Sequence, residues 1–184
     1  MGTVRQAEPV ALVAGILYTD PEPVGRTVSI LTDRFGPLEM ASEPFAFTQT
    51  DYYEPEMGGN LHKFFCCFQR PIMPGELPSL KLMTNDIERE LAGTDTVPPK
   101  RRVNIDPGYV TPAKLVLAST KDFSHRVYLD SGIYGEVTLR CIGGMLVPLD
   151  TTYPDYATQL ALDFFNDVRT FVKRNRKRWI RTGE

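Results

Sequence analysis

Runs and stripes of apolar residues along the chain predict strands and helices in alternation. Residues 10–18 are almost all apolar, which predicts a buried strand. A helix is predicted to follow, because residues 19–23 combine N-cap residues with prolines and an apolar stripe then recurs at steps of four, three and four until Gly36. The stripe consists of Val24, Val28, Leu31 and Phe35.

A second and a third strand are predicted on either side of a loop. Phe45 and Phe47 mark the second strand, which follows Pro44. Residues 61–69 predict the third strand, and both of its faces are largely apolar. The proline and glycine content of residues 51–59 predicts the loop between them.

A second helix and a fourth strand come next. Helical spacing of apolar positions predicts the helix, which ends at Gly93. Its stripe consists of Leu77, Leu80, Thr84, Ile87 and Leu91. After a polar surface connection at residues 94–99, residues 101–105 predict a strand that ends in the turn signal Asp106-Pro107-Gly108.

The C-terminal part of the chain predicts more strands and one long helix. Residues 114–118 are apolar and short, and both a strand and a helical turn fit them. Residues 126–129, 133–141 and 145–149 predict the strands of a meander. A long helix is predicted after Pro154-Asp155 from a last apolar stripe. Its positions are Tyr156, Leu160, Phe164, Val168 and Phe171.

The order of these elements predicts an α+β fold in one domain of 184 residues. Strand, helix, strand, strand, helix, strand is the βαββαβ order of a ferredoxin-like antiparallel sheet with its helices on one face. We expect this core in residues 1–110, a strand-rich extension in 111–150, and the C-terminal helix with a basic tail in 151–184.

Composition and charge exclude several classes of protein. With 42% hydrophobic and 24% charged residues, the chain has the composition of a soluble globular protein. Three cysteines, two of them adjacent, exclude a disulfide framework and a cysteine metal site, so a reducing cytoplasm is expected. The longest apolar run has eight residues, too few to span a bilayer, and no membrane partner is predicted.

The ferredoxin-like topology would bring three polar loops to one edge of the sheet, at residues 18–20, 51–59 and 104–109. Their carboxylates could hold Mg²⁺, which takes oxygen ligands and is often shared with a phosphate. These carboxylates belong to Asp20, Asp51, Glu54, Glu56 and Asp106. We expect Glu54 and Asp106 to be the metal ligands; the alternative is that Asp20 caps a helix and Asp106 forms a turn.

Donors for an anion gather at residues 119–126, where hydroxyl groups, a lysine, an arginine and a histidine lie within eight residues. The alternative is a solvated loop. Two loop tyrosines could stack on a planar ring or merely cover the core. The predicted ligand-binding residues are Tyr52, Tyr53, Glu54, Glu56, Asn104, Asp106, Tyr109, Thr120, Lys121, His125 and Arg126.

Other chemistries find little support. Cys66 and Cys67 lie in a strand among phenylalanines, where a thiol is inert. The glycine patterns of the P-loop and of the Rossmann fold are absent. Residues 173–184 hold six basic residues and one acidic residue, whereas the remainder holds 15 basic and 22 acidic residues. Residues 173–181 could therefore bind nucleic acid, with Trp179 stacking on a base, or form a solvated helix end.

Several longer segments resemble one known family. They are residues 52–58, 103–109, 114–122, 125–129, 132–139 and 152–156. Together these segments resemble a bacterial family catalogued as a domain of unknown function, number 4416, and the resemblance covers nearly the whole chain. Some proteins similar to it carry the label GTP-binding. A G-protein base-reading motif requires a spacer between Lys and Asp, which Thr120-Lys121-Asp122 lacks.

The sequence thus predicts a cytoplasmic α+β domain that binds an anionic small molecule, a nucleotide or phosphorylated metabolite. Mg²⁺ is a candidate cofactor, and whether the protein is an enzyme stays open. The alternative is a non-catalytic module that binds RNA or another protein through the basic tail.

Overall fold

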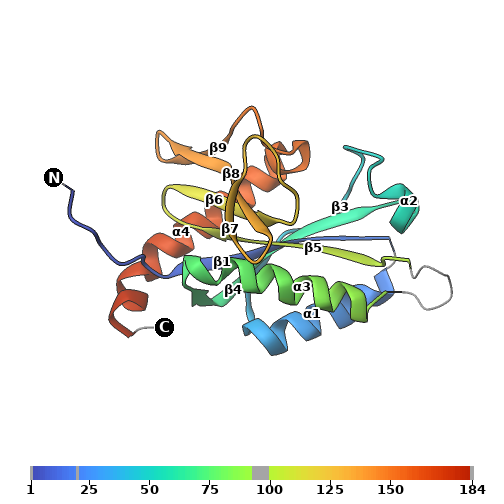
Figure 1. Cartoon of the computed structure of the whole chain (residues 1–184), viewed down its shortest axis with the longest axis horizontal. Helices are drawn as coiled ribbons and strands as arrows, with labels where there is room; N and C mark the ends of the chain where they lie inside the picture. The colour runs from blue at the N-terminus through green and yellow to red at the C-terminus, as the bar shows by residue number, and fades with distance from the viewer. Residues whose placement is uncertain (1, 20, 93–99, 183–184) are drawn as a thin grey trace.

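The computed structural model describes residues 2–19, 21–92 and 100–182, and Figure 1 shows their arrangement. In these residues nine strands form one sheet in which every pairing is antiparallel. The strand order is β2-β4-β1-β5-β6-β8-β7, with β3 beside β4 and β9 beside β8.

The strands are β1 (Val10–Tyr18), β2 (Leu38–Ala41), β3 (Phe45–Ala46), β4 (His62–Ile72), β5 (Val103–Val110), β6 (Lys114–Ser119), β7 (Val127–Asp130), β8 (Ile133–Ile142) and β9 (Met145–Pro148). The helices are α1 (Pro21–Phe35), α2 (Glu54–Met57), α3 (Leu77–Glu90) and α4 (Gln159–Thr182), with short 3₁₀ helices η1 (Pro74–Glu76) and η2 (Pro154–Ala157). The predicted α+β class, antiparallel sheet and long C-terminal helix are confirmed.

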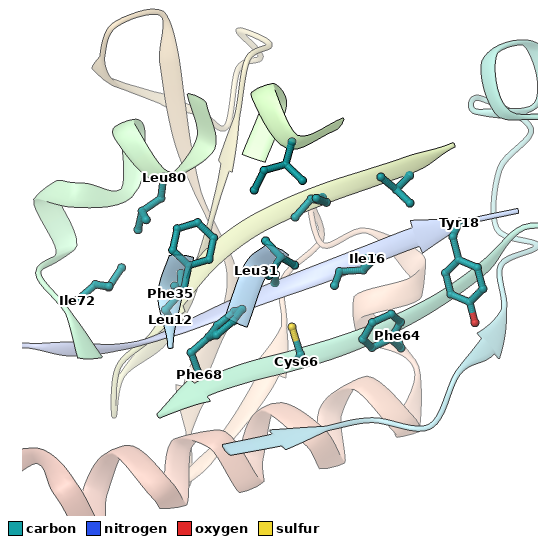
Figure 2. Close-up of a cluster of buried hydrophobic side chains, with 14 of the residues drawn as sticks. Leu12, Ile16, Tyr18, Leu31, Phe35, Phe64, Cys66, Phe68, Ile72 and Leu80 are labelled. Atoms are coloured by element: carbon teal, nitrogen blue, oxygen red, sulfur yellow. The ribbon is translucent and has the colours of Figure 1, made fainter. Parts of the chain in front are cut away.

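One face of the sheet is covered by α1 and α3. Because side chains alternate along a strand, every second residue of β1 points to this face. Figure 2 shows Leu12 and Ile16 of β1 packed with Leu31 of α1 and Leu80 of α3 in a cluster of buried apolar side chains. Phe64 and Phe68 of β4 complete it. The apolar stripes that predicted α1 and α3 are therefore the faces that these helices bury.

The other face is covered by α4 (Figure 1), whose apolar side chains pack on the remaining residues of β1 and β4. Val13 and Phe65 meet Phe165 there. Trp179, near the end of α4, is 1% exposed and lies against Phe171, with 5.5 Å between the ring centroids. The expectation that Trp179 is available to stack on a nucleic-acid base is wrong, because its ring belongs to the core.

The prediction of a turn at Asp106-Pro107-Gly108 is wrong, because these three residues lie inside strand β5. Asp106 pairs with Gly15, and Gly108 pairs with Val13, so the ladder with β1 overrides the local turn preference. The segment 114–118 is part of strand β6, and β2 and α2 were not predicted. The predictions for Asp20, Gly93 and residues 94–99 lie outside the described residues.

Two neighbouring strands separate near the centre of the sheet. β5 pairs with β6 over Gly108–Val110, so the first five residues of β5 lie beyond this ladder. α3 packs beneath this place, because it contacts both β5 and β6. Side chains of α3 can therefore reach into the space between β5 and β6, which side chains from the sheet face covered by α4 also reach. In the described part of the chain, no helix has the length and apolar character needed to cross a membrane.

Candidate functional site

A cavity of about 1230 Å³ lies where β5 and β6 separate. Its wall comes from both faces of the sheet and from two loops. β4, β5 and β8 contribute charged side chains, α3 contributes others from the opposite side, and η2 closes one end. The remaining wall comes from residues within 47–56 and 117–126 and from Ala92, Lys100, Arg101 and Tyr153.

A buried ion pair joins β4 to η2 inside this cavity. Lys63 Nζ lies 2.7 Å from Asp155 Oδ2, and the two side chains are only 6% and 5% exposed. The ammonium also lies 4.5 Å from the centroid of the Tyr156 ring, a cation–π contact. Gly15 of β1 leaves the room that this arrangement needs, because a Cβ there would stand 2.5 Å from Tyr156 Oη and 2.9 Å from Lys63 Cε.

A second buried group reaches the cavity from α3. Lys81 Nζ donates to the carbonyl oxygen of Ile105 at 2.8 Å and to Asp106 Oδ1 at 3.3 Å. Asn104 Nδ2 donates to the other carboxylate oxygen of Asp106 at 2.8 Å. Burial alone would raise the pKa of Asp106, but Lys81, Lys63 and the Asn104 hydrogen bond outweigh burial and lower it.

Glu88 of α3 belongs to the same group, but its pKa is shifted in the opposite direction to that of Asp106. Its Oε1 accepts a 2.7 Å hydrogen bond from the backbone N–H of Ile105 and lies 3.9 Å from Lys81 Nζ. Burial nevertheless raises the pKa of Glu88 above its ordinary value. Two carboxylates of different acidity thus lie around one ammonium group.

A third buried ion pair joins the loop before β7 to β8. Arg126 Nε lies 2.7 Å from Glu136 Oε2, and the side chains are 1% and 3% exposed. Arg126 also donates to the carbonyl oxygen of Lys121 at 2.9 Å and to the Tyr153 hydroxyl. His125 Nε2 lies 3.2 Å from the same oxygen of Glu136. The loop with residues 121–126 is therefore held by Glu136.

Basic side chains that are partly or fully exposed also border the cavity. Arg101 Nη1 donates to Asn104 Oδ1 at 2.8 Å, and its Nη2 lies 3.2 Å from Glu56 Oε2. Lys121 Nζ donates to the Tyr52 hydroxyl and lies 3.9 Å from the centroid of that ring. Counting all described residues of the wall, seven side chains are basic and five are acidic, a net charge of +2.

One residue of the wall has a buried polar atom without a partner. The Tyr156 hydroxyl is buried and finds no hydrogen-bond partner among the residues described. Burial raises its pKa, so the hydroxyl is protonated and can donate. Leaving a buried hydroxyl without a partner costs about 1–3 kcal/mol of the free energy of unfolding. Such a group in a natural fold indicates a role other than stability.

Most of the predicted site residues lie together. Eight of the eleven contribute to the wall: Tyr52, Tyr53, Glu56, Asn104, Asp106, Thr120, Lys121 and Arg126. Glu54 is exposed on α2 and does not contribute, and His125 contacts Glu136 from outside the wall. Tyr109 lies in a separate hollow of about 490 Å³ beside Arg176. Eight predicted residues therefore lie around one cavity, but Tyr18 and Thr19 of the first predicted loop do not contribute to its wall.

The predicted magnesium ligands do not lie on one wall. Glu54 is not part of the cavity that holds Asp106. Both carboxylate oxygens of Asp106 accept hydrogen bonds, from Lys81 and from Asn104. In residues 2–19, 21–92 and 100–182, no three His, Cys, Asp or Glu side chains are grouped to hold a metal ion.

Sequence reasoning missed the buried charges that define the cavity. They are Lys63, Lys81, Glu88, Glu136 and Asp155. One signal was present: a charged residue inside an otherwise apolar strand or helix stripe, such as Lys63 before Phe64-Phe65, must find a partner. The partner is Asp155, 92 residues away, which no local pattern reveals.

One protein family matches residues 8–171, and its description reads domain of unknown function (DUF4416). This description names no activity and no ligand. No curated protein and no solved structure matches the chain.

Proposed function

We propose that this chain, which belongs to the family described as a domain of unknown function (DUF4416), binds an anionic small molecule in the cavity between β5 and β6. A nucleotide or a phosphorylated metabolite fits this description. The observation that carries the proposal is a cavity whose wall has a net charge of +2 and includes three buried ion-paired clusters.

Stability alone is a weak reason for such a group. The desolvation of a buried ion pair offsets most of its Coulomb attraction, so apolar residues in its place are often equally stabilising. The centres of these clusters, Lys63, Lys81 and Arg126, come from three different elements and border one cavity. Buried ionisable groups that converge on a cavity are typical of functional sites.

The sign of the charge indicates the ligand. The whole chain has a net charge of -2, whereas the wall of the cavity has a net charge of +2. An anion is therefore attracted to this place, and it is repelled by the rest of the chain outside the basic residues 173–184, which has a net negative charge. Tyr52, Tyr53 and Phe123 belong to the wall as well, and their rings offer a surface for a planar group such as a base.

Two further proposals concern the setting of this site. We infer that β1, α1, β2, β4, α3 and β5 form a ferredoxin-like layer, which is supported by their chain order and by the cover of α1 and α3 on one face. We also infer a cytoplasmic location. Its support is that Cys66, Cys67 and Cys141 are all free thiols, as a reducing compartment would keep them.

Thermal-shift measurements with nucleotides and sugar phosphates, with and without Mg²⁺, test the proposed function. A ligand at 100 times its Kd stabilises the fold by about 2.7 kcal/mol, which raises the melting temperature by several degrees. We expect at least one compound to do so, and the shift to disappear in the double variant Lys100→Ala/Lys121→Ala.

The matched control is Lys173→Ala/Lys177→Ala, which removes two exposed lysines of α4 that are not part of the cavity wall. This control should keep the full shift. The proposal is wrong if no compound shifts the melting temperature at millimolar concentration, or if both double variants lose the shift equally.

A further inference from the structure

The charges of the cavity wall separate by depth. Seven charged side chains form an inner set, and all but Asp106 are at most 9% exposed. Its basic members are Lys63, Lys81 and Arg126, and its acidic members are Glu88, Asp106, Glu136 and Asp155. The inner set thus has a net charge of -1.

The remaining charged residues of the wall form an outer set, in which four members are basic and one is acidic. They are Arg89, Lys100, Arg101, Lys121 and Glu56. The side chains of Arg101, Glu56 and Arg89 are 34%, 56% and 73% exposed, and both lysines are exposed too. The outer set has a net charge of +3, so the positive charge of the cavity lies at its exposed side.

The inner set is unsuited to an anion. A phosphate among these side chains would add negative charge to a group that already has an excess carboxylate, where little water screens the repulsion. An apolar group would also fit badly, because it would take water away from these charged groups and offer them no hydrogen bonds in return. A neutral group that both donates and accepts hydrogen bonds satisfies this surface.

Hydroxyl groups have this property. They can donate to the carboxylates and accept from the ammonium groups of the inner set. They can also accept from the Tyr156 hydroxyl, which has no partner among the described residues and belongs to the ring that contacts Lys63. A compound with several hydroxyl groups would thus supply what the buried part of the wall lacks.

We propose that the ligand is a sugar phosphate or a compound that contains one, and that it binds with its phosphate at the outer set and its hydroxyl groups at the inner set. This orientation rests on the proposed function, because it assumes that the cavity binds an anion. It adds the chemical class of the ligand and the direction in which the ligand enters.

Titration calorimetry of the full chain with three probes tests the orientation: inorganic phosphate, ribose 5-phosphate and glucose 6-phosphate. At least one sugar phosphate should bind more tightly than inorganic phosphate. Lys121→Ala should weaken inorganic phosphate and that sugar phosphate by the same factor, about tenfold, which is the size of one hydrogen bond to a charged group. Lys177→Ala, which changes an exposed lysine of α4, is the control and should change neither.

Tyr156→Phe should weaken the sugar phosphate about fivefold, the size of one neutral hydrogen bond, and leave inorganic phosphate unchanged. Its melting temperature should not fall, since the hydroxyl it removes makes no hydrogen bond in the described structure. Tyr18→Phe, at a buried tyrosine outside the cavity wall, controls for the loss of a hydroxyl.

The outcomes separate the two proposals. If none of the three probes binds although a compound of the thermal-shift panel does, the sugar-phosphate ligand is overturned and the proposed function stands. If no compound of that panel binds either, the proposed function itself fails. If inorganic phosphate binds and no sugar phosphate binds more tightly, the proposal that hydroxyl groups of the ligand bind at the inner set is wrong. If Tyr156→Phe weakens inorganic phosphate while Lys121→Ala does not, the anion lies at the inner set and the orientation is overturned.

Discussion

Replacing Lys63 by methionine tests whether the buried charges of the cavity are as costly as the account requires. The change keeps most of the length of the side chain but removes the ammonium group that lies 2.7 Å from Asp155 Oδ2. Asp155 is 5% exposed, so its carboxylate would stay buried without its partner. Breaking a buried pair in this way costs about 3–5 kcal/mol of the free energy of unfolding.

Two comparisons isolate the cause of this loss. In the double variant Lys63→Met/Asp155→Leu both charges are gone, so we expect most of the stability to return. The pair Arg26 and Glu90 is 3.5 Å apart with side chains 66% and 50% exposed, and Arg26→Ala should cost less than about 1 kcal/mol because water screens that pair.

Urea unfolding at pH 7 measures these differences through the midpoint at constant slope. A loss of 3–5 kcal/mol is a large share of the roughly 5–15 kcal/mol that holds a natural fold together, so the effect is easy to detect. The reasoning is refuted if Lys63→Met costs less than about 1 kcal/mol, or if the double variant is as unstable as the sum of its single changes.

Three other changes have defined outcomes. Gly15→Ala should cost about 1–3 kcal/mol in urea unfolding, because its Cβ would stand 2.5 Å from Tyr156 Oη, whereas Gly25→Ala on α1, where a Cβ meets nothing within 4 Å, should stabilise the chain slightly. Asp106→Asn should be less stable than the natural chain at pH 7. Since the pKa of Asp106 is lowered below its ordinary value of 3.8, its contribution is lost as the pH falls below 3.8, and the difference measured by urea unfolding should shrink there. The Cys66 thiol, whose pKa burial raises to about 12, should resist a thiol reagent at pH 8 in the folded chain and react once urea unfolds it.

Contradicting results are equally defined for these three. Equal destabilisation by both glycine changes would show that the contact between a Cβ at position 15 and Tyr156 is not the cause of the lost stability. A difference for Asp106→Asn that stays constant down to pH 2 would mean that its ionised form does not stabilise the fold. Rapid labelling of Cys66 in the native chain would contradict its burial.

Those parts of the fold that local patterns determine could be predicted from the sequence. The stripe from Val24 to Phe35 predicts α1 because a helix with one apolar face has to bury it, and the structure buries Leu31 and Phe35 against β1 and β4. The prediction of a turn at Asp106-Pro107-Gly108 was wrong because a contact with a distant segment, and not the local pattern, determines the structure there. Its residue types favour a turn locally, but pairing with residues 13–15, some 90 positions earlier, holds them in a strand.

The candidate site was predictable to the same extent. Tyr52 was found because its segment was recognised as a polar loop at the sheet edge, and Lys121 because anion donors cluster at residues 119–126; the structure places the two side chains in direct contact. Lys63, Lys81 and Asp155 were not found, because each of their roles depends on a partner in a distant element. Only the folded chain shows that β5 and β6 separate and that these charges meet in the space between them.

The central claim, that this cavity binds an oxyanion at its exposed basic side, is tested most directly by anomalous diffraction from crystals soaked in tungstate, which resembles phosphate and reveals its own position. We expect a tungstate peak in the cavity, in contact with Arg101 or Lys121 and away from Asp155. Tungstate bound elsewhere on the chain with none in the cavity, or bound beside Asp155 at the inner set, would contradict it.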